Sequence, residues 1–351
     1  MNPIRVLIVD DSATNRRTIQ EILQSAPEVE VVGKASDGEE ALRSALTLKP
    51  DLVTLDLQMP RMDGFTFLRI LMSRLPLPVI VVSTYSGKEN VFKALELGAL
   101  DFIAKPGKDD DPVAHREEIL AKVGMVRHLS ARAIRGHEPP ITGSVTLPTT
   151  TRTQPGTPAK TLVAIGASTG GPAAIGELVE KLPADLDAAV VVAQHMPEKF
   201  TRTFAERLDR RSACAVREAT DGELLAKGVV LVAPGRRCLE VAQDGEARRV
   251  RVVAPAPGDR YVPSVDRLFT TAAGVFGPDL VAVVLTGMGD DGKDGVQEVA
   301  ARGGRVMAEA PETAVIFGMP GAAVRTGCVH KVVPLGRIAE TLLKMVKEQS
   351  S

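Results

Sequence analysis

Short apolar runs, each ended by a polar or charged residue, recur along this chain and alternate with segments of helical spacing. A run that is apolar on successive residues is typical of a strand buried on both faces. Strands that alternate with helices predict a parallel sheet whose crossover helices cover both faces. In the first part of the chain the predicted strands are Arg5–Val9, Glu30–Gly33, Asp51–Leu55, Pro78–Val82 and Asp101–Ala104.

Charged residues stand where three of these strands end. Asp10 and Asp11 follow the first strand, and Asp56 follows the third. Because the carboxyl ends of parallel strands meet at one edge of a sheet, we expect these carboxylates to converge, with Lys105 from the end of the fifth strand beside them. Carboxylates that lie so near one another repel. A bound Mg²⁺ relieves this repulsion and keeps some of its waters, which a phosphoryl ligand can replace. The pattern predicts a Mg²⁺ site in which Asp56 accepts a phosphoryl group.

Residues 1–125 resemble a response-regulator receiver domain, a flavodoxin-like α/β fold, over all five strands. The resemblance implies that Asp56 is the phosphoacceptor and that a histidine kinase is the donor. It also implies that Asp10, Asp11 and Asp56 hold Mg²⁺ together with the backbone carbonyl of Gln58. The family's switch hydroxyl position falls on Ser83, and its switch aromatic position falls on Phe102. Its lysine position falls on Lys105, and the resemblance implies a cis bond between Lys105 and Pro106.

The middle of the chain loses this periodicity. Residues 112–129 continue as a helix, but residues 130–159 contain scattered prolines and a run of threonines. Such a composition is typical of a flexible or extended linker. We therefore expect a receiver domain over residues 1–125, a helix end and linker over 126–159, and a second domain over 160–348.

The second domain opens with an apolar strand that breaks at a glycine-rich turn around Ser168. Residues 166–170 read G-x-S-x-G, and Pro172 begins a helix. Flanking glycines allow the sharp bend that lifts a hydroxyl out of the strand end, and the helix amides point at the same place. The turn fits a nucleophilic serine, and it also fits a glycine-rich cradle for a phosphate.

A histidine and two aspartates follow other predicted strands of this domain. His195 comes after the run 188–193, and the run 280–285 leads into a loop that contains Asp290 and Asp291. A hydroxyl, an imidazole and a carboxylate are the groups that nucleophilic acyl transfer needs. His330 lies in a strand-like segment, where we expect a structural or surface role. Either aspartate could supply the acid.

Residues 160–348 resemble the catalytic domain of the chemotaxis protein-glutamate methylesterases, the CheB family. The motifs that carry the resemblance are Ile165–Pro172, Gln194–Pro197 and Leu285–Gly292. The order Ser, His, acid differs from the order in α/β-hydrolases. We expect a second doubly wound, Rossmann-like parallel sheet, with an antiparallel hairpin around Gly245.

The resemblance implies a role for each motif residue. Ser168 is the nucleophile, His195 the general base, and Asp291, directly before Gly292, the third member, with Asp290 as the adjacent alternative. It also places oxyanion or substrate contacts near Thr169 and Met288.

The implied reaction is hydrolysis of glutamate γ-methyl esters on the cytoplasmic helices of methyl-accepting chemoreceptors, with deamidation of glutamines. No cofactor is implied for the esterase domain. Phosphorylation of Asp56 by the chemotaxis histidine kinase is implied to relieve inhibition by the receiver.

Charge and composition narrow the class of protein. The chain has 43 Lys and Arg against 44 Asp and Glu, so it offers no electrostatic case for binding nucleic acid or an anionic membrane. It shows no signal peptide, and no apolar run approaches the ~20 residues that span a bilayer. The cysteines are too widely spaced for a metal pattern. We expect a soluble cytoplasmic protein without membrane insertion or nucleic-acid partner.

Two other output functions fit the second half of the sequence less well than the esterase does. A nucleic-acid-binding output would need a compact helix-turn-helix with a basic face, which the second half lacks. A nucleotide-binding output would use the serine turn as a phosphate cradle, but no G-K-[ST] follows the turn.

Overall fold

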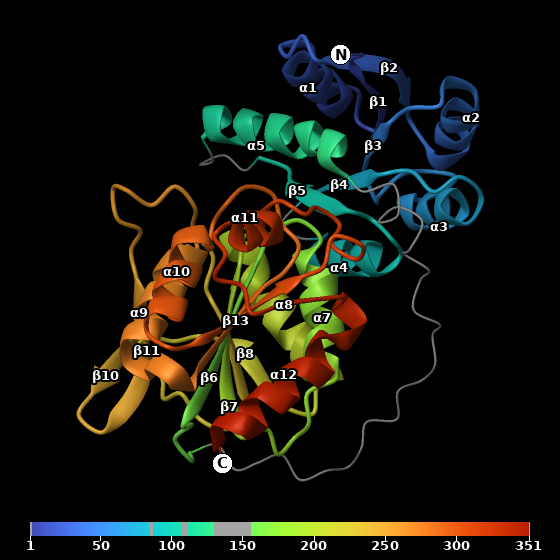
Figure 1. The fold of residues 1–351 in the computed structure, drawn as a ribbon. Helices are drawn as coiled ribbons and strands as arrows, with labels where there is room; N and C mark the ends of the chain where they lie inside the picture. Colours follow the sequence, from blue (N-terminus) through green and yellow to red (C-terminus); the bar gives the residue numbers. More distant parts are fainter. Residues whose placement is uncertain (1, 85–86, 107–110, 130–155, 351) are drawn as a thin grey trace. The chain divides into compact units, whose positions relative to one another are not determined.

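The computed structural model describes residues 2–84, 87–106, 111–129 and 156–350. The chain divides into two compact units, residues 1–142 and 143–351. Most of the predicted linker, residues 130–155, lies outside the described residues. Each unit contains a parallel sheet with helices on both faces, which confirms the expected α/β class (Figure 1).

The first unit is built on a five-stranded sheet. Its elements are β1 (Ile4–Val9), α1 (Ala13–Gln24), β2 (Val29–Ala35), α2 (Gly38–Leu48), β3 (Leu52–Leu55), α3 (Gly64–Arg74), β4 (Val79–Ser83), α4 (Lys88–Glu96), β5 (Asp101–Ala104), α5 (Pro112–Gly124) and the 3₁₀-helix η2 (Met125–His128).

The strand order of this sheet is β2-β1-β3-β4-β5, and all neighbours are parallel. Helices α1 and α5 cover one face, and α2, α3 and α4 cover the other (Figure 1). The order reverses between β1 and β3, and in open α/β sheets ligands bind at the carboxyl ends beside such a reversal. Asp10 and Asp56 follow these two strands.

The second unit contains a larger sheet and a hairpin. Its elements are β6 (Thr161–Ala167), α7 (Gly171–Glu180), β7 (Ala188–Gln194), α8 (Glu198–Arg211), β8 (Ala215–Glu218), β9 (Val229–Val232), β10 (Cys238–Asp244), β11 (Ala247–Val253), α9 (Val265–Phe276), the 3₁₀-helix η3 (Gly277–Asp279), β12 (Leu280–Val284), α10 (Lys293–Ala301), β13 (Arg305–Glu309), α11 (Met319–Arg325), β14 (Lys331–Val333) and α12 (Leu335–Ser350).

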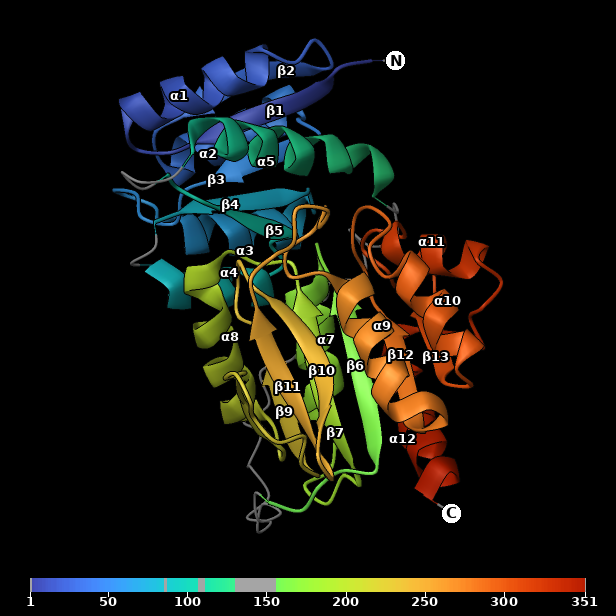
Figure 2. The ribbon, with the colours of Figure 1, turned by 90° about the vertical axis from the view of Figure 1, so that its left-hand side faces the viewer.

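Seven parallel strands form this sheet in the order β14-β13-β12-β6-β7-β9-β8. Helices α7, α8 and α12 cover one face, and α9 and α10 cover the other (Figure 1). From β6 the strands are added on one side, as β7, β9 and β8, and later on the other side, as β12, β13 and β14. The strand order therefore reverses between β6 and β12. Figure 2 shows β12, β6 and β7 side by side. Strands β10 and β11 form the expected antiparallel hairpin.

Two strands of this sheet, β8 and β13, were missed in the sequence. Both are short and carry charged residues, Arg217 and Glu218 in β8 and Arg305 and Glu309 in β13. A short run with charges at its ends shows neither the alternation nor the apolar length by which strands are recognised. Among the described residues, no helix has both the length and the apolar character needed to cross a bilayer.

Candidate active site

Strand register brings the predicted nucleophile and base together. Strands β6 and β7 are parallel neighbours, and Ala167 pairs with Gln194 at their carboxyl ends. Ser168 and His195 each follow directly, and the His195 N–H donates to the Ala167 carbonyl at 3.1 Å. The Gln194 side-chain amide donates to the carbonyls of Ser168 at 2.9 Å and His195 at 3.0 Å. One amide therefore holds both strand ends.

The turn that carries Ser168 depends on a glycine. Gly170 has φ +78°, and a Cβ there would lie 2.8 Å from the Cβ of Val315. A side chain at this position would be strained in its backbone and would also collide with its neighbour. The N–H of Gly171, the first residue of α7, donates to the Ser168 carbonyl at 2.8 Å. The bend leaves Ser168 half-buried at the sheet edge.

Thr286 ties the serine turn to the loop after β12. The Ser168 N–H donates to the Thr286 carbonyl at 3.0 Å, and the Thr286 hydroxyl donates to the Thr169 carbonyl at 3.0 Å. The same hydroxyl accepts from the Ile316 N–H at 3.0 Å. Thr286 was not predicted as a site residue, and its only sequence signal is its place between an apolar strand and a glycine-rich loop.

Asp291 is the aspartate that meets the imidazole. Its Oδ2 lies 2.8 Å from His195 Nε2 and accepts from the Val265 N–H at 2.8 Å. Its Oδ1 accepts from the Asp266 N–H at 2.9 Å. These N–H groups belong to the first turn of α9. The N–H groups of a first turn have no acceptor within the helix, and the helix dipole favours an anion there. The carboxylate is 1% exposed. Asp290 instead accepts from the Tyr261 hydroxyl at 3.0 Å.

The surroundings of Asp291 keep it ionised. Burial on its own would raise the pKa of Asp291, but the hydrogen bond and charge of His195, with the two helix N–H groups, hold this pKa below its ordinary value. An ionised carboxylate fixes the ring orientation and stabilises an imidazolium. Nε2 is the ring nitrogen that contacts Asp291, which leaves Nδ1 free of that carboxylate. The predicted role of His195 as general base stays a prediction.

The remaining predicted residues are less tightly connected. Among the described residues, the Ser168 hydroxyl makes no hydrogen bond to His195. The hydrogen bond between a nucleophile and its base often forms only when substrate is bound. Thr169 is buried, whereas Met288 is 37% exposed in the loop between Thr286 and Asp291. Their predicted oxyanion or substrate roles stay predictions. His330 Nδ1 accepts from the Val306 N–H at 3.0 Å, which fits a structural role.

Glu309 lies behind this site and was also missed. It ends β13, is fully buried, and accepts from the Thr286 N–H at 2.8 Å through Oε2. Burial raises the pKa of Glu309 to about 7, although the Thr286 hydrogen bond opposes the rise. Its sequence signal is a glutamate after only three apolar residues, 306–308, a run too short to indicate a buried strand.

Glu309→Gln is expected to change how stability depends on pH. The pKa of Glu309 is raised from 4.5 to about 7, so the folded state retains a proton that the unfolded state has lost. The free energy of unfolding should therefore fall by about 3 kcal/mol as the pH rises from 4.5 to about 7. Above this window, Glu309 no longer contributes to the pH dependence. Glutamine does not ionise but still accepts from Thr286, so the variant should lack this fall. Urea unfolding at pH 5 and pH 8 measures the difference.

A matched control for this prediction is Glu312→Gln, an exposed glutamate on the segment after β13. It should follow the pH dependence of the parent. If Glu309→Gln and the parent lose equal stability between pH 5 and pH 8, Glu309 is ionised in both states and the prediction is wrong.

The first unit brings the predicted phosphoacceptor residues together. Lys105 Nζ lies 2.6 Å from Asp56 Oδ2 and 2.9 Å from Asp10 Oδ2. Asp56 Oδ1 accepts from the Gln58 N–H at 3.1 Å. Carboxylate oxygens of Asp10, Asp11 and Asp56 all lie within 4.8 Å of one another. An all-oxygen donor set of this size fits a hard divalent cation such as Mg²⁺.

Burial and charge act against each other in this cluster. Burial raises the pKa of Asp56 above its ordinary value, more than the Lys105 hydrogen bond lowers it. For Lys105 burial alone would lower the pKa, but the carboxylates of Asp56 and Asp10 outweigh it and the pKa is raised. Lys105 is therefore a permanent cation that offsets part of the acidic charge.

The predicted switch residues line the neighbouring strands. Ser83 is buried at the end of β4, and its carbonyl accepts from the Lys105 N–H at 2.7 Å. Phe102 is buried in β5, with its ring 6.5 Å from that of Phe92 in an edge-on arrangement. Their switch roles stay predictions. The expected cis bond before Pro106 was wrong: among the described residues the cis bond is Val262–Pro263, and nothing in the structure explains the difference.

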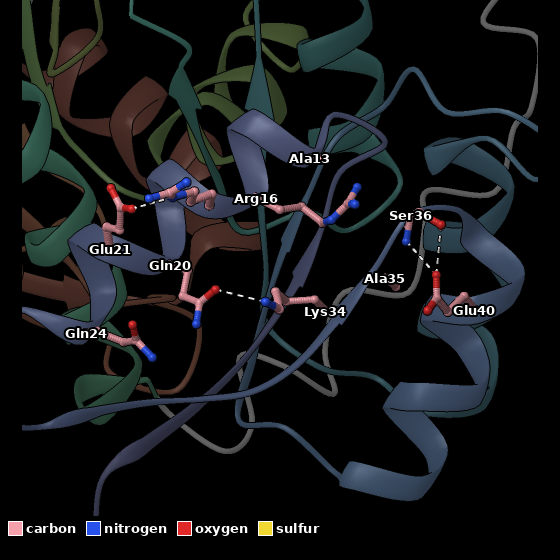
Figure 3. A pocket seen from close by; sticks show the side chains of 10 residues that line it. Ala13, Arg16, Gln20, Glu21, Gln24, Lys34, Ala35, Ser36 and Glu40 are labelled. Carbon is pink, nitrogen blue, oxygen red and sulfur yellow. Dashed lines mark hydrogen bonds and ion pairs between the residues drawn. The ribbon is translucent and has the colours of Figure 1, made fainter.

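A pocket of about 570 Å³ lies on the same unit between α1 and β2 (Figure 3). Its polar side chains bond one another: Arg17 to Glu21 at 2.8 Å, and Lys34 to Gln20 at 2.9 Å. None of the predicted site residues is among those that line it. Arg16, which lines the pocket, donates to the Asp10 carbonyl, so the pocket adjoins the phosphoacceptor cluster without being lined by its side chains.

Comparison with known proteins gives matches to both units. Residues 163–342 match the CheB methylesterase family, and residues 6–116 match the response regulator receiver domain family. A protein-glutamate methylesterase/protein-glutamine glutaminase of Geobacter sulfurreducens is 48% identical over 362 residues, covering 98% of each chain. One of Myxococcus xanthus is 47% identical over 359 residues, covering 99% of this chain and 98% of the relative.

A solved structure supports the fold of the second unit. The crystal structure of the Thermotoga maritima CheB methylesterase catalytic domain is 38% identical, with a TM-score of 0.52. It covers 53% of this chain and 98% of its own.

Proposed function

The chain belongs to the CheB methylesterase family and carries a response-regulator receiver domain, and from this premise we propose that Ser168, His195 and Asp291 hydrolyse glutamate γ-methyl esters on methyl-accepting chemoreceptors. Its relatives are named for methylesterase and glutaminase activity, so it is an enzyme of this type. The observation that carries the proposed triad is the 2.8 Å contact between His195 and the buried Asp291, one strand end away from Ser168.

In the proposed reaction Ser168 Oγ attacks the ester carbonyl while His195 takes the hydroxyl proton. The tetrahedral adduct collapses to an acyl-enzyme, and the methoxy group leaves as methanol with the proton from His195. Water then attacks the acyl-enzyme, with His195 again as base, and frees the glutamate and Ser168. With a glutamine side chain the leaving group is ammonia. Backbone N–H groups near the turn would stabilise the oxyanion, each by a factor of the order of 10²–10³.

The test is methanol release from receptors whose glutamates carry a labelled methyl group, incubated with the full chain. Volatile label is expected to appear in proportion to enzyme, and new carboxyl groups should appear on the receptor. Label that stays on the receptor under conditions in which a related methylesterase releases it would contradict this function. Because the substrate glutamates of the family lie on cytoplasmic helices, we propose that the chain acts in the cytoplasm.

Control of the esterase is proposed to come from the first unit. The chemotaxis histidine kinase would transfer a phosphoryl group to Asp56, and Mg²⁺ would be held by carboxylates of Asp10, Asp11 and Asp56 and by the Gln58 carbonyl. When bound, Mg²⁺ offsets the negative charge that gathers at the phosphoryl group. Lys105, which contacts Asp56 and Asp10, would rearrange to pair with the phosphoryl oxygens.

Asp56→Asn is expected to abolish activation by a phosphodonor, because an amide cannot form the acyl phosphate. With donor and Mg²⁺ present, methanol release by the variant should equal that of the parent without donor. The comparison is made with Asp51→Asn, an exposed aspartate before β3 that should retain activation. Activation of the Asp56→Asn variant to the level of the parent would exclude Asp56 as the phosphoacceptor.

A further inference from the structure

An aromatic ring lies flat against the predicted general base. The Tyr261 ring stacks on the His195 imidazole with 5.2 Å between ring centroids and 6° between ring planes. Offset parallel stacking is a favourable geometry for two aromatic rings. Asp291 holds the imidazole through one edge, at Nε2. A single bond to one nitrogen leaves the ring free to swing about that bond, whereas a flat neighbour fixes the plane of the ring.

The Tyr261 side chain is held through its hydroxyl and through its ring. Its hydroxyl donates to Asp290 Oδ1 at 3.0 Å, and Arg260 contacts the same oxygen at 3.2 Å. The Arg260 guanidinium also lies 5.2 Å from the Tyr261 ring centroid. Burial, followed by the hydrogen bond to Asp290, raises the pKa of Tyr261, so the hydroxyl remains a donor at neutral pH.

The loop after β12 leaves room for this ring at a glycine. A Cβ on Gly289 would lie 2.5 Å from the Tyr261 hydroxyl oxygen, and Gly289 has φ +88°. Backbone at this φ strains any side chain, and the contact would displace the tyrosine. Gly289, Asp290 and Asp291 are therefore consecutive residues that accommodate Tyr261, anchor its hydroxyl and hold His195.

We propose that Tyr261 is a positioning residue for His195: its ring fixes the imidazole plane in which the base takes the Ser168 proton, and Asp290 fixes the tyrosine. Adjacent aspartates thus have separate tasks, Asp291 on the imidazole and Asp290 on the ring that covers it. This inference rests on the proposed triad. Orientation of a base matters because proton transfer in the transition state requires a near-ideal geometry.

The test compares Tyr261→Leu and Tyr261→Phe with the parent in the methanol-release assay. Leucine removes the stacked ring and should lower kcat about 10-fold, with KM within about 2-fold, since the aromatic pair and the geometry it holds are lost. Phenylalanine keeps the ring and loses only the anchor, so kcat should recover to within about 3-fold of the parent. Active-site titration with a serine-directed phosphonate corrects each kcat for the fraction of folded enzyme.

Two outcomes would overturn the inference. One is a corrected kcat for Tyr261→Leu equal to that of the parent. The other is equal losses in the leucine and phenylalanine variants, which would mean that the hydroxyl alone matters. Ser168→Ala, measured in parallel, separates this inference from the proposed triad. If Ser168→Ala is inactive while Tyr261→Leu is fully active, the positioning role fails and the triad stands; if Ser168→Ala is active, the triad itself fails.

Discussion

Ser168→Ala is expected to lower methanol release by about 10⁶-fold, to the level that substrate binding and oxyanion donors alone support. Without the hydroxyl no acyl-enzyme forms, and His195 has no proton to take. The loss should appear in kcat. It is measured by labelled methanol release at high enzyme concentration, and by mass spectrometry, in which the acylated chain should be absent.

The fold should tolerate this change, because the bonds that hold the turn use the backbone of Ser168. Its N–H donates to Thr286, and its carbonyl accepts from Gly171 and Gln194. A matched control is Thr270→Ala, which removes an exposed hydroxyl on α9 and should leave activity unchanged. Ser168→Ala activity above a tenth of the parent, with a parent-like melting temperature, would show that another group is the nucleophile.

Asp291→Asn is expected to lower kcat by about 10⁴-fold. The asparagine NH₂ would donate where the carboxylate accepts, so the imidazole would have to reverse its tautomer and present a protonated nitrogen to Ser168. The amide oxygen can also no longer serve the N–H groups of Val265 and Asp266 as two carboxylate oxygens do. The measurement is the kcat for methanol release, with the melting temperature recorded to separate a tautomer effect from unfolding.

Asp290→Asn is the matched control for Asp291→Asn, because it makes the same change at the adjacent aspartate. Asparagine Oδ1 can still accept from the Tyr261 hydroxyl, and the lost pair with Arg260 is largely exposed, where ion pairs contribute little. We expect a loss of only a few fold. A greater loss for Asp290→Asn than for Asp291→Asn would assign the third role to Asp290, against the contact seen in the structure.

The strands that place the sites could be read from the chain itself, because a continuous apolar run is a local property. The runs that became β6, β7 and β12 are fully buried, and the polar residues that follow them lie at one edge of the sheet. Strands β8 and β13 lack such a run, and their place in the sheet depends on pairing with β9 and β12. Residues 126–129 and 156–159 are the described parts of the predicted linker, and its domain boundaries stay a prediction.

The sequence by itself determined the α/β class, the strand ends that carry Asp10, Asp56, Ser168 and His195, and the family motifs. Only the tertiary structure shows that Asp291, and not Asp290, contacts His195. The N–H groups that hold Asp291 come from α9, which is not adjacent to Asp291 in the sequence. Only the tertiary structure placed Tyr261 on the imidazole and Glu309 behind Thr286. Apolar periodicity reports whether a segment is buried, whereas contact between two side chains depends on the path of every segment between them.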